Sequence, residues 1–90
     1  MNPQALKDNS ELLEYLTRIA LILRDQKYME LAEEVERAGL FASGSPSEFM
    51  YEAQTSLERV ASAKPAGIEL SEVQSAINQI KEAFRAVGGA

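Results

Sequence analysis

The chain has 90 residues, with 14 Asp and Glu against 9 Lys and Arg for a net charge of −5, and it contains neither histidine nor cysteine. Without cysteine no disulfide or thiolate metal site is available, and without histidine the commonest general base and metal ligand are missing. A chain of this length holds one domain at most, so we expect a single domain over residues 1–90.

The first helical pattern covers residues 9–24, where apolar residues recur every three or four positions as they do on one helix face. These residues are Leu12, Leu16, Ile19, Ala20 and Leu23. If the helix continued, this face would next carry one lysine and two glutamates, whose burial is costly. We therefore predict a break near Asp25-Gln26-Lys27 and a second helix at about 28–38; one long bent helix is the alternative.

The second helix has its own apolar stripe, which consists of Tyr28, Leu31, Ala32 and Val35. Further apolar residues lie off the two stripes: Tyr15, Leu21, Ile22 and Met29. Apolar side chains on several faces of one helix indicate either a central, surrounded helix or a helix partly covered by another chain. The sequence leaves both interpretations open.

The stretch Gly39 to Glu52 reads "GLFASGSPSEFMYE" and predicts a corner between helices. Gly39 has the place of a glycine that ends a helix, and Leu40 and Phe41 follow as its usual apolar contact. Ser45 precedes a proline and has a glutamate three positions later, which is typical of a helix N-terminus with a capping box.

The third predicted helix covers residues 45–63, and its apolar stripe consists of Phe49, Ala53, Leu57 and Val60. It ends at Lys64-Pro65-Ala66-Gly67, because proline restricts the residue before it and has no backbone N–H to donate.

The last predicted helix covers residues 70–87 and carries the most regular stripe: Val73, Ile77, Ile80, Phe84 and Val87. Ser71 and Gln74 have the spacing of a capping box, and two glycines follow the helix. Strand signals are weak, since neither period-two alternation nor a hairpin turn sequence occurs. We therefore predict an all-α fold, a compact bundle of three to four helices.

Residues 24–38, within "LILRDQKYMELAEEVERAG", resemble the turn and second helix of a tetratricopeptide unit, with Tyr28 and Ala32 in the aromatic and small positions. No second copy follows at a period of about 34 residues, so we do not predict a repeat protein. The wider pattern "LAEEVERAG…GSPSE" resembles small all-helical bacterial proteins, some of them similar to immunity proteins of toxin systems. That resemblance implies protein binding and identifies no functional residue.

Acidic residues are concentrated in the middle of the chain. From Glu30 to Glu58 there are seven glutamates against Arg37, a net charge of −6, while the remaining residues sum to about +1. This disfavours nucleic acid, whose binding requires clustered Lys and Arg, and favours a basic protein partner. The candidate partner-binding residues are Tyr28, Glu30, Glu33, Glu34, Glu48, Tyr51 and Glu52. An ordinary solvated acidic face is the alternative.

No apolar run approaches the roughly 18 residues that span a bilayer, and the N-terminus lacks the organisation of a secretory signal. We therefore expect a cytoplasmic protein with no membrane partner.

Catalytic chemistry has little support. Neighbouring glutamates occur, as in Glu48 with Glu52, but carboxylate catalysis requires a cleft and one desolvated acid. Ser43, Ser45 and Ser47 have no histidine to activate them, and no phosphate-binding loop is present. We expect no catalytic residue, no metal site and no cofactor.

These patterns predict a non-catalytic protein-binding module of the toxin-immunity or adaptor type. The alternative is a structural bundle that binds only itself, as a homodimer through the stripe of residues 70–87.

Overall fold

The computed structural model describes residues 9–86, which fold into four α-helices without a β-strand among them. This confirms the all-α bundle predicted from the sequence. A short 3₁₀ helix, η1 (Leu40–Ser43), joins the second helix to the third. The α-helices are α1 (Asn9–Asp25), α2 (Met29–Gly39), α3 (Pro46–Ala63) and α4 (Leu70–Ala86). Val87 and the glycines after it, predicted to complete and end the last helix, lie outside the described residues.

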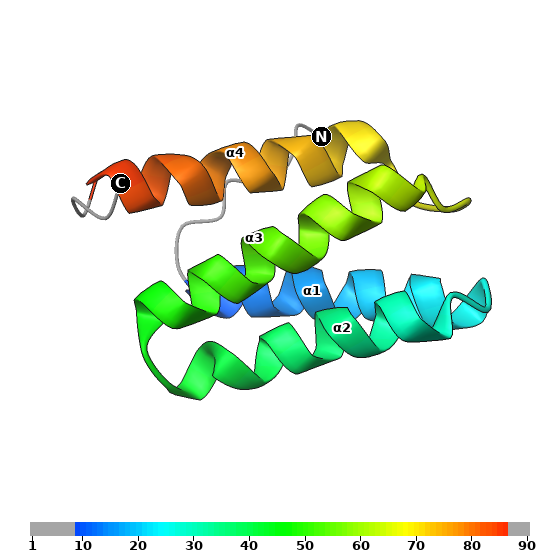
Figure 1. Cartoon of the computed structure of the whole chain (residues 1–90), viewed down its shortest axis with the longest axis horizontal. Helices are drawn as coiled ribbons and strands as arrows, with labels where there is room; N and C mark the ends of the chain where they lie inside the picture. Colours follow the sequence, from blue (N-terminus) through cyan, green and yellow to red (C-terminus); the bar gives the residue numbers. More distant parts are fainter. Residues whose placement is uncertain (1–8, 87–90) are drawn as a thin grey trace.

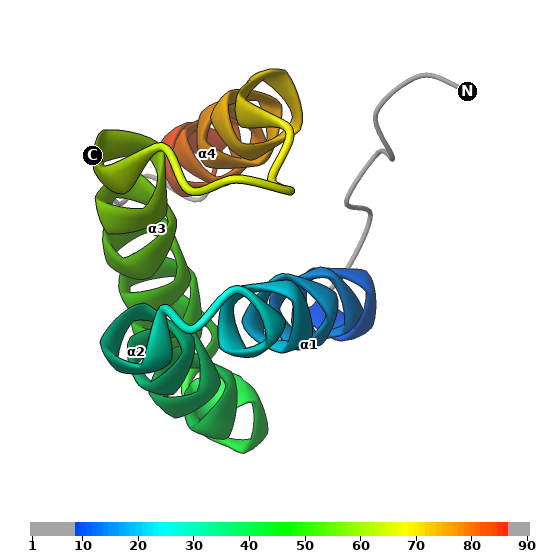
Figure 2. The ribbon, with the colours of Figure 1, turned by 90° about the vertical axis from the view of Figure 1, so that its right-hand side faces the viewer.

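Successive helices run antiparallel, and each one packs against the next (Figure 1). In the view along the bundle, α3 lies between α2 and α4, whereas α1 lies beside α2 (Figure 2). The interpretation of α1 as a central, surrounded helix is therefore wrong. Its outer face stays in contact with solvent, and Leu21 on that face is 63% exposed.

The predicted stripes form the core. The five apolar residues on one face of α1 are buried, and so are the four on α3, of which Phe49 and Leu57 are completely inaccessible to solvent. Burying a side chain of that size stabilises a fold by about 1.5–3 kcal/mol. On α4, Val73, Ile77 and Ile80 are buried in this same core. The part of the α4 stripe that the structure describes therefore supplies packing within the chain.

The break between α1 and α2 lies where the charge pattern predicts it, at residues 26–28. Lys27 has a φ of 73°. The Tyr28 N–H donates to the Leu23 carbonyl at 2.8 Å, and the Lys27 N–H donates to the Arg24 carbonyl at 3.1 Å. This is the Schellman hydrogen-bond pattern, with lysine in the left-handed position that glycine usually occupies. The turn therefore forms without glycine, at a cost of about 1 kcal/mol in backbone conformation.

Gly39 does not end a helix in the predicted way. It has right-handed helical dihedral angles, φ −63° and ψ −25°, and the chain continues through it into η1. A Cβ atom at this position would lie 3.1 Å from Leu13 Cδ1, so glycine permits α1 and α2 to approach closely. Phe41 packs against the core as expected, but Leu40 is 76% exposed and makes no such contact.

The N-terminus of α3 has the predicted serine cap and the predicted proline at its first position. The Ser45 hydroxyl accepts a hydrogen bond from the Glu48 N–H at 3.4 Å, and Pro46 is the first helical residue. The capping box predicted for α4 is wrong, because α4 already begins at Leu70 and Ser71 lies inside its first turn. The Glu69 carbonyl accepts the first hydrogen bond of that helix, from the Val73 N–H.

The loop between α3 and α4 packs against the end of α1. Lys64 ends α3 in a left-handed conformation, and Gly67 has a φ of +83°. A Cβ atom on Gly67 would lie 3.4 Å from both the Ile22 and the Gln26 side chains. The loop backbone therefore lies close to the end of α1, in addition to the packing of α2 against α3 that joins the two pairs of helices.

The turn at Lys27 generates a prediction. We expect Lys27→Gly to raise the free energy of unfolding by about 0.5–1 kcal/mol. Glycine adopts a positive φ without steric strain, and the strain removed is larger than the extra conformational entropy that glycine loses on folding. Urea denaturation followed by circular dichroism measures the change. Lys27→Ala is the control: it removes the charge but keeps a Cβ, so it should not stabilise the fold. A less stable glycine variant would contradict this account of the turn.

The core generates a second prediction. Leu57→Ala should lower the free energy of unfolding by about 2–5 kcal/mol, because it removes buried methyl groups and leaves a cavity in the middle of α3. Leu40→Ala is the matched control on a leucine that is 76% exposed. It should change stability by less than about 0.5 kcal/mol. Equal effects of the two variants in urea denaturation would contradict the assigned core.

Candidate partner-binding surface

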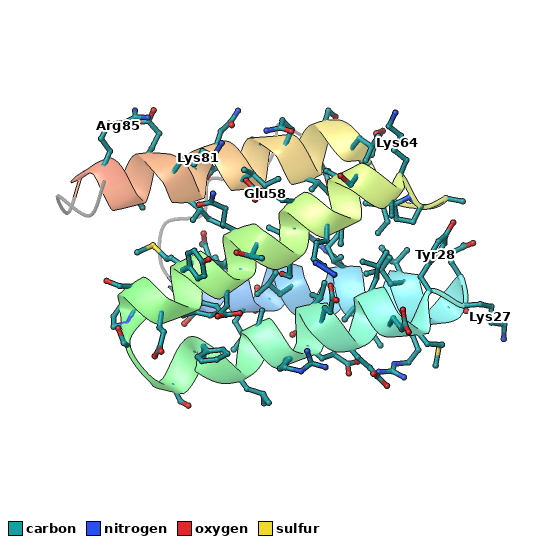
Figure 3. The ribbon with its side chains drawn as sticks, viewed as in Figure 1. Lys27, Tyr28, Glu58, Lys64, Lys81 and Arg85 are labelled. Atoms are coloured by element: carbon teal, nitrogen blue, oxygen red, sulfur yellow. The ribbon has the colours of Figure 1, made fainter. Side chains whose placement is uncertain are left out.

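The seven residues predicted to bind a partner lie on α2, on α3 and in the turn before α2, but not as one cluster. α2 and α3 are antiparallel, so the start of α2 lies beside the end of α3. Tyr28 and Glu30 consequently lie at the end of the bundle that also carries Lys27 and Lys64 (Figure 3). Glu48, Tyr51 and Glu52 lie at the opposite end of this surface. The structure brings Glu34 and Glu52 together, in one groove between the two helices.

Arginines from outside the acidic segment neutralise part of this surface. Arg24 on α1 donates from Nη2 to both carboxylate oxygens of Glu36, each at 2.7 Å. Arg59 on α3 donates from Nε to Glu34 Oε1 at 2.8 Å. The hydrogen bond from Arg24 to Glu36 raises the pKa of Arg24 above its ordinary value. When the acidic segment is extended to include Arg24 and Arg59, residues 24–59 carry eight acids against four bases, a net charge of −4.

These ion pairs have no signal in the sequence. Their members are 12 and 25 residues apart and lie on different helices. A count of charges along the chain cannot show them, and only the antiparallel packing of the helices brings them together. Exposed pairs of this kind contribute at most about 1 kcal/mol to stability, so their main effect here is on the charge that the surface presents.

The groove between α2 and α3 has a volume of about 220 Å³. Its lining consists of Glu34, Arg37, Ala38, Glu52, Thr55, Ser56 and Arg59. Ser56 is buried, and its hydroxyl donates to the Ala53 carbonyl at 3.1 Å. Among the described residues, Arg37 and Glu52 form no ion pair, although they line the same groove as the paired Glu34 and Arg59.

Tyr51 is the most exposed aromatic side chain in the described chain, at 60%. It lies on the outer face of α3, three positions after Glu48 and one before Glu52. The Thr55 hydroxyl donates to the Tyr51 carbonyl at 2.9 Å, an intrahelical hydrogen bond that leaves the phenol ring free to contact a partner.

Tyr15 on α1 is a second unusual polar group. The residue is only 6% exposed, and its hydroxyl has no hydrogen-bond partner. Burial raises the pKa of Tyr15 to about 12, with a smaller contribution from the negative charge of Glu72 on α4. The Arg18 guanidinium lies 5.5 Å from the ring centroid and favours the phenolate slightly. In the sequence, Tyr15 is recognisable only as an apolar residue off the stripe, and no local pattern indicates that its hydroxyl is buried.

The opposite side of α3 has a different character. A groove of about 430 Å³ between α3 and α4 is lined by residues that include Glu58, Lys64 and Lys81. Lys81 and Arg85 project from α4, and Arg85 pairs with Glu82 at 2.9 Å (Figure 3). Residues 70–86 carry two acids and two bases, so this helix presents no net charge. Most of the acidic excess therefore lies within residues 24–59, which carry a net charge of −4.

Over residues 9–86, no three acidic side chains are grouped closely enough to hold a metal ion. In the same part of the chain, no helix is both long and apolar enough to cross a membrane.

Comparison with known proteins identified no matching family model, and no curated protein or solved structure with significant similarity to the chain. The function is therefore inferred from the surface itself.

The buried hydroxyl of Tyr15 generates a prediction. Tyr15→Phe should raise the free energy of unfolding by about 1 kcal/mol, because an unsatisfied buried hydroxyl is costly and phenylalanine keeps the ring contacts. In an alkaline titration, the variant should lose the tyrosinate absorbance step with a midpoint near pH 12.

The pH dependence of stability provides the control for Tyr15. Its folded-state pKa lies above the ordinary value of 10.0. The preference of the fold for the neutral phenol is therefore fully present below pH 10 and is lost progressively as pH rises through 12. Tyr15→Phe should lack this loss. A wild-type titration without a step near pH 12 would contradict the assigned burial.

Proposed function

We propose that the protein is a non-catalytic binding module for a basic protein, and that it binds through the acidic outer surface of α2 and α3. The observation that carries this proposal is the exposed Tyr51 ring between Glu48 and Glu52 in sequence, within a segment, residues 24–59, of net charge −4. Tyrosine supplies a large contact area at low entropic cost and is enriched at binding hot spots. Surrounding carboxylates attract a basic partner and set its orientation.

The burial of the charged residues supports a non-catalytic role. Among the described residues, Ser56 and Tyr15 are the buried residues that carry a side-chain hydroxyl, and every described glutamate and lysine is exposed or half-buried. Catalysis by carboxylate or lysine usually depends on burial that shifts the pKa of the group toward neutrality. The surface carboxylates lie in the solvated setting that suits electrostatic recognition.

The chemistry of the surface limits the class of partner. A toxin-neutralising role and an adaptor role are both compatible with recognition of a basic protein. In each case the partner would contribute lysine or arginine side chains to Glu48 and Glu52 and an apolar contact to Tyr51. Such association should be sensitive to salt, because exposed charges are screened over about 10 Å at 0.1 M ionic strength.

The test is an NMR titration of isotopically labelled protein with a lysine-rich amphipathic helical peptide. We expect shifts of the backbone signals around Glu48, Tyr51 and Glu52, with affinity falling roughly tenfold between low and high salt. Tyr51→Ala should weaken binding by about tenfold, equivalent to the loss of about 1.4 kcal/mol.

Leu21→Ala is the matched control, since Leu21 is 63% exposed and lies on α1, away from this surface. It should leave the affinity unchanged. Peptide-induced shifts of equal size around Glu69, Glu72 and Glu82 would show non-specific attraction to any carboxylate, and the proposal would then fail.

A further inference from the structure

Two opposite charges in the α2–α3 groove have no partner within the described chain. Arg37 projects from α2 and Glu52 from α3, and both line the groove of about 220 Å³. Their neighbours Glu34 and Arg59 are joined at 2.8 Å across the same groove. The groove thus contains one satisfied pair of charges and one unsatisfied pair.

The surroundings of these two charges permit close approach by another surface. The groove is lined by two small residues as well, Ala38 and Ser56. The Ser56 hydroxyl is turned inward to the Ala53 carbonyl. Arg37 is exposed and Glu52 is half-buried, so both side chains are accessible from outside. Tyr51, the neighbour of Glu52 in sequence, is 60% exposed and adds an apolar area beside the groove.

When two copies of one surface meet about a twofold axis, an arginine of each copy can face a glutamate of the other. In such an isologous contact, residue i of one copy meets residue j of the other, and residue j meets residue i. A partner that contributes only lysine or arginine side chains would pair with Glu52 and leave Arg37 unpaired. A second copy satisfies both groups.

We propose that two copies of this chain associate through their α2–α3 grooves. The Arg37 guanidinium of each copy donates hydrogen bonds to the Glu52 carboxylate of the other, and the two Tyr51 rings pack beside these ion pairs. The contact is small and polar, so the dimer is weak and forms at high micromolar concentration. The two Arg37–Glu52 pairs set the relative position of the two copies, because a guanidinium and a carboxylate form two parallel hydrogen bonds in one plane.

This self-association uses another surface than the α4 stripe, whose described residues Val73, Ile77 and Ile80 are buried in the chain's own core. It does not depend on the proposed function. Both occupants require Glu52, so a basic partner and a second copy exclude one another.

Sedimentation velocity of the full chain over about 10 μM to 1 mM, in 0.15 M salt, tests the dimer. The wild-type protein should show a sedimentation coefficient that rises with concentration. Arg37→Glu and Glu52→Arg should each remove this rise, because each places like charges opposite one another. The double variant, which exchanges the two charges, should restore it.

A mixture of the two single variants gives the most specific readout. One copy then carries only acids at these positions and the other only bases, so we expect the mixture to form a heterodimer although neither variant associates alone. Glu82→Arg and Arg85→Glu on α4 make the same changes in net charge outside the groove, and each should leave the association intact. Circular dichroism confirms that each variant is folded.

Three outcomes would overturn the proposal: a wild-type chain that stays monomeric up to 1 mM, single variants that still associate, or a mixture that does not. Failure here is separable from failure of the proposed function, because the peptide titration is carried out at dilute concentration on the monomer.

Discussion

The apolar stripe of α3 holds the described helices in their arrangement. Phe49, Ala53, Leu57 and Val60 are completely inaccessible to solvent, and α3 lies between α2 on one side and α4 on the other. Because this one face is fully covered, the rest of α3 is fixed in rotation about its own axis. The positions of Tyr51 on the outer surface and Glu52 in the groove follow directly. The surface that carries the proposed function is therefore set by the core beneath it.

The secondary structure was largely predictable because its signals are local. Apolar periodicity defined the helix faces, and Ser45 and Pro46 marked the start of α3. The charged residues after Leu23 placed the break between α1 and α2, although no glycine or proline marks it. At Gly39 the same reasoning gave the wrong answer. Glycine is common after a helix, but here it is required by the approach of Leu13 from another helix, and no pattern within α2 reports that contact.

The candidate surface was predictable only in composition. The sequence identified the acidic segment and its tyrosines, but it treated seven residues as one group. Antiparallel packing places Tyr28 and Tyr51 at opposite ends of α2 and α3, and it supplies Arg24 and Arg59 from outside the segment. What distinguishes this surface is therefore its pattern of paired and unpaired charges. That pattern depends on tertiary contacts between residues far apart in sequence, which net charge along the chain does not describe.

The order of packing, in which each helix contacts mainly the next one in the chain, also has a consequence for how the protein folds. Contacts between consecutive helices join residues that are close in sequence. Forming them closes only short loops of chain, so the entropy lost on forming each pair of helices is small. Helical domains with local contacts fold in microseconds to milliseconds. The turn at residues 26–28 closes the α1–α2 hairpin without any contribution from α4. Assembly of the chain can thus begin at either hairpin, and the packing of α2 against α3 joins the two halves.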